Sequence, residues 1–202
     1  NSEVAYMGCR TRVMGNVYDP NRESTCGRGN LSFTSINLPR LGIEAKGDLE
    51  RFYQLLDEKI DLVIRQLLHR FKIQAAKKCR NYPFLMGQGV WIDSDTLDID
   101  DSVGEVLKHG TLSVGFIGLA ETLTALTGKH HGQSPASQQL GLEIIGHMRR
   151  RMDEEAKKTG LNFTLLATPA EGLSGRFVRI DKKIYGEIPG VTDRDYYTNS
   201  FH

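Results

Sequence analysis

The feature that most constrains the fold is a run of apolar residues that recurs at three- and four-residue steps between about Asp48 and Lys78. This spacing places apolar side chains on one face of an α-helix that is long enough to flank a sheet. The run consists of Leu49, Phe52, Leu55, Leu56, Ile60, Val63, Ile64, Leu67, Leu68 and Phe71. The pattern therefore predicts one long amphipathic helix over this stretch.

Three short segments rich in β-branched, aromatic and alternating apolar residues predict strands, at residues 31–37, 111–116 and 161–167. Pro39 closes the first of them. Helices are predicted at 119–126 and 135–159, with Gly160 as a stop signal. Strands separated by helices of this length imply parallel βα units, so the expected fold class is an α/β sheet or barrel.

The charge balance excludes a simple polyanion-binding surface, because 26 Lys and Arg face 25 Asp and Glu in 202 residues. Any phosphate binding must be local. The three cysteines have no C-x-x-C spacing that would indicate zinc. No apolar run of about 18 residues and no signal peptide occurs, so we expect a cytoplasmic protein with neither membrane nor nucleic-acid partners. The chain opens without methionine and ends abruptly, which favours an excised segment.

Cys9 lies in a stretch, residues 8–29, that is dense in Gly, Asn, Asp, Pro and Arg and is predicted to be a long structured loop. Arg10 beside it favours the thiolate. The alternative is a partly buried loop cysteine without chemistry, and for an isolated cysteine burial is the more common explanation.

The segment Thr168-Pro169-Ala170-Glu171-Gly172-Leu173-Ser174 follows the last predicted strand and precedes a helix. Main-chain amides in such a turn, at the positive end of a helix dipole, form an anion site. The expected ligand is a substrate phosphate, bound mostly by main chain from Thr168, Ala170, Gly172, Leu173 and Ser174. A plain strand-to-helix connection is equally consistent with the pattern.

Glu171 has two interpretations. It either hydrogen-bonds or handles a proton at the substrate, or it stabilises the helix start through its charge. Other candidates are set aside: His130 and His131 are expected to face solvent, and Arg149–Arg151 to form a solvated face. Cys26 and Cys79 are interpreted as structural or surface residues.

Four ordered segments, Met7–Thr11, Cys26–Arg40, Gly110–Glu121 and Ala167–Gly172, resemble the class III anaerobic ribonucleotide reductases, which are glycyl radical enzymes. The resemblance implies a ten-stranded α/β barrel with a central finger loop. The chain would be a fragment of that catalytic barrel over residues 1–202, with the finger loop and its return at 8–30 and α/β units at 31–202.

The resemblance also implies roles for single residues. Cys9 matches the finger-loop cysteine that becomes a thiyl radical and removes the 3′-hydrogen of the substrate ribose. Asn30 matches an asparagine placed against the ribose, where an amide offers both donor and acceptor. From the residues alone, Asn30 would be interpreted as a turn residue before the strand.

Cofactors and partners follow from the same resemblance. The family carries a glycyl radical and a zinc site near the C-terminus, both absent from this segment, and formate is the expected reductant. Ribonucleoside triphosphates are the expected substrates, with dNTP and ATP effectors, a radical-SAM activating enzyme and a homodimer in the parent protein. The fragment alone is expected to be inactive.

Two alternatives stay open on the sequence. One is another glycyl radical enzyme, of the formate-lyase or dehydratase type, which would take a substrate other than a nucleotide. The other is a non-catalytic nucleotide-binding module in which the loop at Thr168–Ser174 anchors phosphate and Cys9 is inert.

Overall fold

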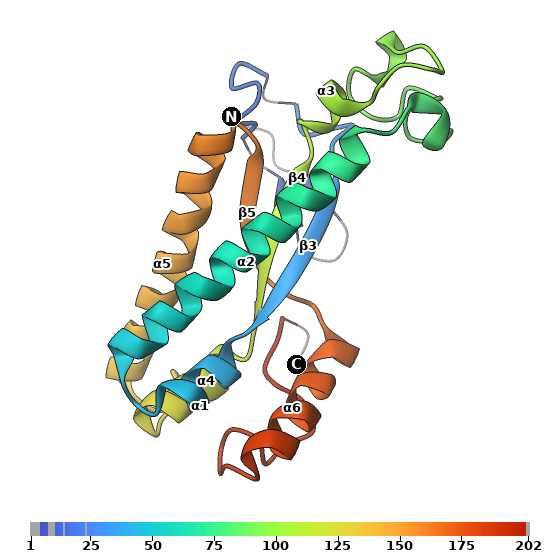
Figure 1. Cartoon of the computed structure of the whole chain (residues 1–202). Helices are drawn as coiled ribbons and strands as arrows, with labels where there is room; N and C mark the ends of the chain where they lie inside the picture. The colour runs from blue at the N-terminus through green and yellow to red at the C-terminus, as the bar shows by residue number, and fades with distance from the viewer. Residues whose placement is uncertain (1–4, 8–10, 14, 23, 201–202) are drawn as a thin grey trace. The chain divides into compact units, whose positions relative to one another are not determined.

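The computed structural model describes residues 5–7, 11–13, 15–22 and 24–200, and strands alternate with helices along most of this length (Figure 1). The strands are β1 (Ala5–Met7), β2 (Thr11–Val13), β3 (Asn30–Asn37), β4 (Thr111–Ile117) and β5 (Asn162–Ala167). The α-helices are α1 (Leu38–Ala45), α2 (Leu49–Ala75), α3 (Gly104–Leu107), α4 (Leu119–Thr127), α5 (Pro135–Thr159) and α6 (Glu171–Tyr185). Short 3-10 turns occupy Cys79–Asn81 and Ser94–Thr96.

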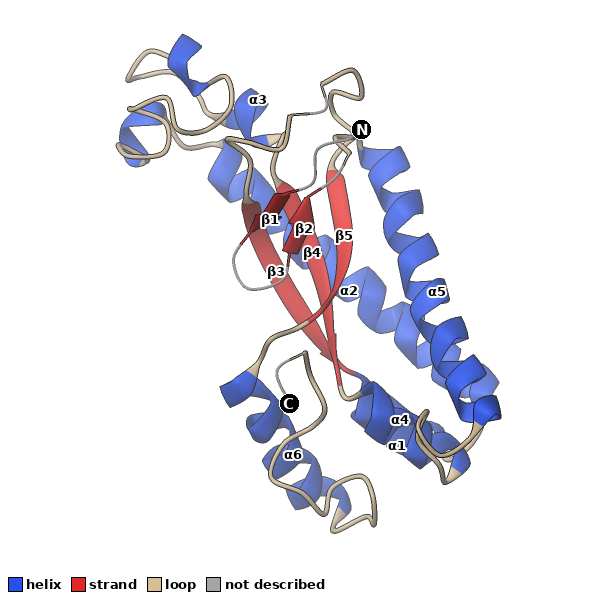
Figure 2. Cartoon of the chain, turned by 180° about the vertical axis from the view of Figure 1, so that it is seen from behind, coloured by secondary structure: helices blue, strands red, loops and turns tan. Residues whose placement is uncertain are grey.

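Strands β3, β4 and β5 form a three-stranded sheet with β4 in the middle (Figure 2). The amide of Thr111, at the start of β4, donates to the carbonyl of Gly29, just before β3, at 2.9 Å. The amide of Thr168, just after β5, donates to the carbonyl of Phe116 near the end of β4 at 3.1 Å. The start of β4 thus lies beside the start of β3, and the end of β5 lies beside the end of β4, so the three strands are parallel. The predicted α/β class with a parallel sheet is confirmed.

Helix α1 begins directly after β3 and was not predicted. Pro39 lies in its first turn, where the missing N–H costs nothing and the fixed φ suits a helix. The strand does end at Asn37, as the proline predicted. The chain therefore enters a short helix before α2, where the sequence alone indicated only a strand end.

The described residues belong to two compact units, which divide the long elements between them. Unit 1 comprises 1–34, 64–113 and 151–164, and unit 2 comprises 35–63, 114–150 and 165–202. Strands β3, β4 and β5 and helices α2 and α5 run from one unit into the other. Each unit has its own apolar cluster, so each is described by itself.

The core of unit 1 is built by the connection between α2 and β4. Its buried cluster consists of Cys79, Met86, Trp91, Val103, Val106 and Leu107. The indole nitrogen of Trp91 donates to the carbonyl of Val106 at 2.7 Å, which satisfies the one polar atom of the buried ring. Cys79 is thus a packing residue of this cluster, in a 3-10 turn after α2.

The core of unit 2 gathers the end of β4, helix α6 and the segment that follows α6. Ile117, Val178, Val191 and Tyr197 form its buried cluster. Helices α1 and α4 lie side by side, close enough that a Cβ at Gly42 would come 3.1 Å from the carbonyl oxygen of Thr122 (Figures 1 and 2). The small residue thus permits the close approach of the two helices.

Two fully buried carboxylates hold the C-terminal segment of unit 2 in place. Asp181 on α6 accepts hydrogen bonds from Asn37, from the Arg40 guanidinium at 2.8 and 2.6 Å, and from the Tyr197 hydroxyl at 3.0 Å. Burial raises the pKa of the Tyr197 hydroxyl, and the nearby Asp181 carboxylate raises it further. A buried carboxylate needs such partners, because an unpaired one would cost several kcal/mol.

Glu121 on α4 is the second buried carboxylate. It forms an ion pair with Arg194 and accepts from the amide and the hydroxyl of Thr198 at 3.1 and 2.9 Å. The carbonyl of Thr198 in turn accepts from the amide of Gly118. The segment after α6 is therefore attached to α4 by both charge and main chain.

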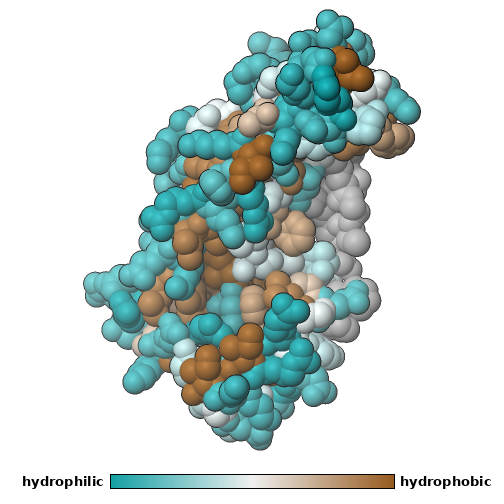
Figure 3. All heavy atoms as spheres, turned by 45° about the vertical axis from the view of Figure 1, so that its right-hand side comes forward, coloured by the Kyte–Doolittle hydropathy of each residue, from teal (hydrophilic) through white to brown (hydrophobic). Residues whose placement is uncertain are grey.

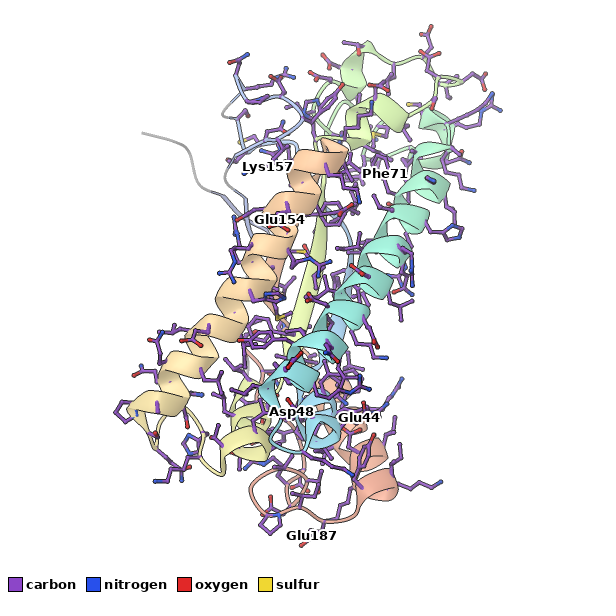
Figure 4. All side chains as sticks on the ribbon, turned by 60° about the vertical axis from the view of Figure 1, so that its left-hand side comes forward. Glu44, Asp48, Phe71, Glu154, Lys157 and Glu187 are labelled. Atoms are coloured by element: carbon purple, nitrogen blue, oxygen red, sulfur yellow. The ribbon has the colours of Figure 1, made fainter. Side chains whose placement is uncertain are left out.

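The face of the described part that Figure 3 shows is mostly hydrophilic, with apolar patches between polar ones. Glu154 and Lys157 mark the exposed polar face of α5 (Figure 4). Large apolar side chains that are more than half exposed are Phe33, Leu62, Phe84, Ile99, Leu142 and Ile184. Among the helices of the described residues, none combines the length and the apolar character needed to cross a membrane.

Candidate active site

The predicted reactive residue, Cys9, lies outside the described residues. On either side of it in the sequence, β1 and β2 pair antiparallel, with Ala5 opposite Val13 and Met7 opposite Thr11. The residue composition predicts a loop over residues 8–29, and β2 falls within that range. The two paired strands are an addition to the prediction, since three-residue strands are too short to show a periodicity.

Downstream of β2, the chain is anchored to the strand starts of unit 1 by Arg28, which is buried. Its guanidinium donates to the carbonyl oxygens of Gly15 at 3.1 Å, Ser24 at 3.5 Å and His109 at 2.9 Å. Burial lowers the pKa of Arg28 from its ordinary value. Arg28 therefore connects both ends of the segment 15–28 to His109, which lies two residues before β4.

Asn162, the first residue of β5, provides a second anchor for the same segment. Its Nδ2 donates to Asn16 Oδ1 at 3.1 Å and lies 3.2–3.3 Å from the carbonyl oxygens of residues 108–110, while its Oδ1 accepts from the amide of Val17 at 2.8 Å. One amide side chain thus connects the segment after β2 to the residues before β4.

His109 completes this polar cluster and is itself buried. Its Nδ1 accepts from Asn16 Nδ2 at 2.8 Å, its Nε2 lies 3.2 Å from the Asp93 carboxylate, and its ring meets Tyr18 edge-on. Burial lowers the pKa of His109, while Asp93 opposes this by a smaller amount. The ion pair between Arg22 and Asp93, at 2.6 Å, holds the pKa of Asp93 below its usual value.

Asn30, the second predicted catalytic residue, is exposed at the first position of β3. Its Oδ1 accepts a hydrogen bond from the hydroxyl of Ser113 on β4 at 3.3 Å, and Ser113 is fully buried. The Ser113 hydroxyl lies 3.0 Å from that of Thr164 on β5. The residue is therefore part of a strand rather than a turn, and side chains of all three strands meet here.

Thr168, predicted to bind substrate, is buried in unit 2 with each of its polar groups paired. Its amide donates to Phe116, its carbonyl accepts from the Ser200 amide at 3.4 Å, and its hydroxyl lies 2.7 Å from that of Ser35. The path of the chain after β5 is therefore determined by three separate interactions. None of them involves the residues of α6.

The start of α6 carries the remaining predicted residues. Ala170, the N-cap, and Leu173 pack their side chains against the apolar cluster of unit 2. Ser174 is buried, and its amide and hydroxyl both donate within the first turn, to Ala170 and Glu171 at 2.9 Å. Glu171 and Gly172 are exposed.

The amides of the first three helical residues, Glu171 to Leu173, have no intrahelical acceptor, as at every helix start. The N-cap has no side-chain hydrogen bond to them. Any anion binding here would thus come from main chain together with the helix dipole. This is the form of binding that the sequence predicted, although Ser174 uses its own donors internally.

The structure brings Thr168 and residues 170–174 together in unit 2, whereas Asn30 belongs to unit 1. Sequence reasoning missed Ser113 and Thr164 beside Asn30, and Ser35 beside Thr168. Their contacts cross between strands and depend on register, so no local pattern reveals them. Among the described residues there is no group of three or more His, Cys, Asp or Glu side chains that could hold a metal ion.

The fold resembles solved structures of anaerobic ribonucleotide reductase. The enzyme of Thermotoga maritima with citrate in the active site matches 80% of this chain and 28% of its own chain, with a TM-score of 0.65 and 18% identity. The same enzyme in complex with dATP and CTP matches 80% of this chain and 25% of its own, with a TM-score of 0.61. The fold is thus that of part of a ribonucleotide reductase.

The family model described as anaerobic ribonucleoside-triphosphate reductase matches residues 1–202. The reductase of that name from Escherichia coli is 41% identical over 202 residues, covering 97% of this chain and 28% of the relative. The one from Enterobacteria phage T4 is 32% identical and covers 98% and 32%. The chain belongs to the anaerobic ribonucleoside-triphosphate reductase family, and it spans about a third or less of the length of these relatives.

Proposed function

We propose that this chain is part of the catalytic barrel of a reductase that converts ribonucleoside triphosphates to deoxyribonucleoside triphosphates by thiyl-radical chemistry at Cys9. The observation that carries the proposal is the family match over the whole chain. The same four sequence segments that carry the resemblance also contain Cys9, Asn30 and Glu171.

The ten-stranded barrel is supported by the exposed side of the sheet. Parallel sheets are normally covered on both faces, yet Phe33 on β3 is 53% exposed. Ala167 at the end of β5 is also exposed. Further strands of a longer chain would cover these residues. The antiparallel pairing of β1 with β2, on either side of residues 8–10, suits a loop with Cys9 at its tip.

In the proposed reaction, the Cys9 sulfur removes the 3′-hydrogen of the ribose, forming S–H as C–H breaks, and later returns it. The two bonds have comparable strength, so the exchange is reversible. A glycyl radical elsewhere in the longer protein would oxidise the Cys9 thiol. Asn30 would hold the sugar hydroxyls, with donor and acceptor in one uncharged group.

The phosphates of the substrate would bind at the start of α6. The amides of Gly172 and Leu173 face outwards from the first turn by helix geometry, and the partial positive charge of the helix end favours an anion. Thr168 and Ser174 would then shape the loop through their internal hydrogen bonds, and Ala170 through its packing. Glu171, at the first helical position, would act on the substrate.

Formate is the proposed reductant, and the zinc site is assigned to parts of the longer protein outside this chain. The Thermotoga maritima complex with dATP and CTP supports nucleotides as substrates and effectors. A radical-SAM activating enzyme, a homodimer and a cytoplasmic location complete the proposal.

The test uses the full-length protein that contains this chain, activated anaerobically, and follows conversion of ribonucleoside triphosphate to the deoxy product. Cys9→Ala should abolish turnover. Cys26→Ala serves as the matched control, because Cys26 is an exposed free cysteine in the same loop region, and it should retain turnover. An active Cys9→Ala enzyme would overturn the proposal.

A further inference from the structure

The side chains around Asn30 form a row across the sheet, from β5 through β4 to β3. Thr164 Oγ1 lies 3.0 Å from Ser113 Oγ, and Ser113 Oγ lies 3.3 Å from Asn30 Oδ1. Ser113 is fully buried on the middle strand, while Asn30 is exposed at the edge of the row. The row therefore leads from the sheet interior to the candidate catalytic amide.

Each hydroxyl carries a single hydrogen, and this determines which atom donates in each hydrogen bond of the row. An amide oxygen only accepts, so the single hydroxyl hydrogen of Ser113 is directed to Asn30 Oδ1. Ser113 then has only lone pairs left for Thr164, so Thr164 must donate to Ser113. The order of donation runs from Thr164 to Ser113 to Asn30.

We infer that Ser113 and Thr164 are positioning residues that orient the Asn30 amide, so that its Nδ2 donors face the substrate. The inference rests on the proposed function, in which Asn30 contacts the ribose. With Oδ1 occupied by Ser113, the two N–H groups of Asn30 are the part of the amide available to a sugar hydroxyl oxygen. Within the described residues, Asn30 Nδ2 donates no hydrogen bond.

The orientation has a chemical consequence. A primary amide that rotates freely turns either its oxygen or its nitrogen towards a ligand, whereas one held at its oxygen keeps its two N–H donors on one fixed side. Pre-orientation of this kind lowers the barrier because the group need not be ordered during the reaction. The loss of one such hydrogen bond should change the rate by between about twofold and about tenfold, the effect of a single neutral hydrogen bond.

The experiment compares Thr164→Val, Thr164→Ser and Asn30→Ala in the full-length protein that contains this chain. Valine has the shape of threonine without the hydroxyl, and serine keeps the hydroxyl. Thr164→Val should lower kcat by about twofold to tenfold with little change in KM, and Thr164→Ser should restore it. Thr127→Val is the control, since Thr127 is also paired with a serine hydroxyl, Ser137, at 3.2 Å but on α4.

A double-mutant cycle separates positioning from a merely structural role. If Thr164 acts through Asn30, Thr164→Val should have no further effect in the Asn30→Ala background. The same proportional loss in both backgrounds would overturn the inference, as would full activity of Thr164→Val beside an impaired Asn30→Ala. Full activity of Asn30→Ala would remove the role proposed for Asn30 and, with it, this inference.

Discussion

The hydroxyl oxygens of Ser35 and Thr168 lie 2.7 Å apart, and Gly115 on the middle strand leaves the space in which they meet. A Cβ at position 115 would come 2.8 Å from the Ser35 hydroxyl and even closer to that of Thr168. Glycine is therefore required at this point by the close approach of three strands, and not by its backbone angles.

Gly115→Ala should lower the free energy of unfolding of the 202-residue chain by about 1–3 kcal/mol, because the added methyl overpacks a closed site. Urea unfolding would measure the change. Gly172→Ala is the matched control: a Cβ there meets nothing within 4 Å, and alanine is the better helix former. Equal stability of the Gly115→Ala and wild-type chains would contradict the packing described here.

Asp181→Asn should destabilise the chain by about 3 kcal/mol, because it removes the charge that Arg40 pairs with and places an amide donor among other donors. The Arg40 side chain is 32% exposed, so water offsets part of its loss. Thermal unfolding would be compared with Glu187→Gln, which breaks the exposed pair with Lys182 and should change stability by less than about 1 kcal/mol. Similar losses in the two variants would argue against the Asp181 network as a stabilising element.

The chain should lose stability as the pH falls below about 6.5, through His109. Burial holds the folded-state pKa of His109 below its ordinary value of 6.5, so the unfolded chain takes up the proton first. The stabilisation is complete above the unfolded pKa and decreases as the pH falls towards the folded one. Urea midpoints between pH 7.5 and pH 5 should fall less steeply for His109→Asn than for the wild type. The exposed His131→Asn control should follow the wild-type slope.

Glu171→Gln should reduce turnover of the full-length protein by about 100-fold or more if its carboxylate handles a proton at the substrate. Its effect on helix α6 alone should be small, about 0.5 kcal/mol, since the residue is exposed in the first turn. Turnover and the unfolding midpoint are measured on the same variant. Unchanged turnover would leave Glu171 with only its role at the helix dipole.

The long elements were predictable because their periodicity extends over many turns. Helix α5 has the predicted bounds, 135–159, and α2 ends three residues before the predicted Lys78. The stretch after α2 was not predictable in the same way. Its 3-10 turns depend on individual hydrogen bonds, such as those that the hydroxyls of Ser94 and Thr96 donate to main-chain carbonyls. Hydrogen bonds of this kind leave no periodic pattern in the sequence.

The candidate site was predictable only through the resemblance to a family. Cys9 and Asn30 have no spacing that identifies them, and their own surroundings favour a loop and a turn. Ser113, the partner of Asn30, lies 83 residues further along the chain, and Thr164, the partner of Ser113, lies a further 51 residues along. Contacts of this kind depend on the register of the sheet, which a single sequence does not display.

Arg28 donates hydrogen bonds to the backbone carbonyl oxygens of Gly15, Ser24 and His109. Through these three bonds the guanidinium recognises the course of the main chain at Gly15, Ser24 and His109. Substitutions of Gly15 and Ser24 that keep the backbone geometry should therefore preserve these hydrogen bonds, whereas Asn16 also holds the segment through its side chain. Mutational tolerance in this loop should accordingly be high at the tethered positions, and low at the arginine that tethers them.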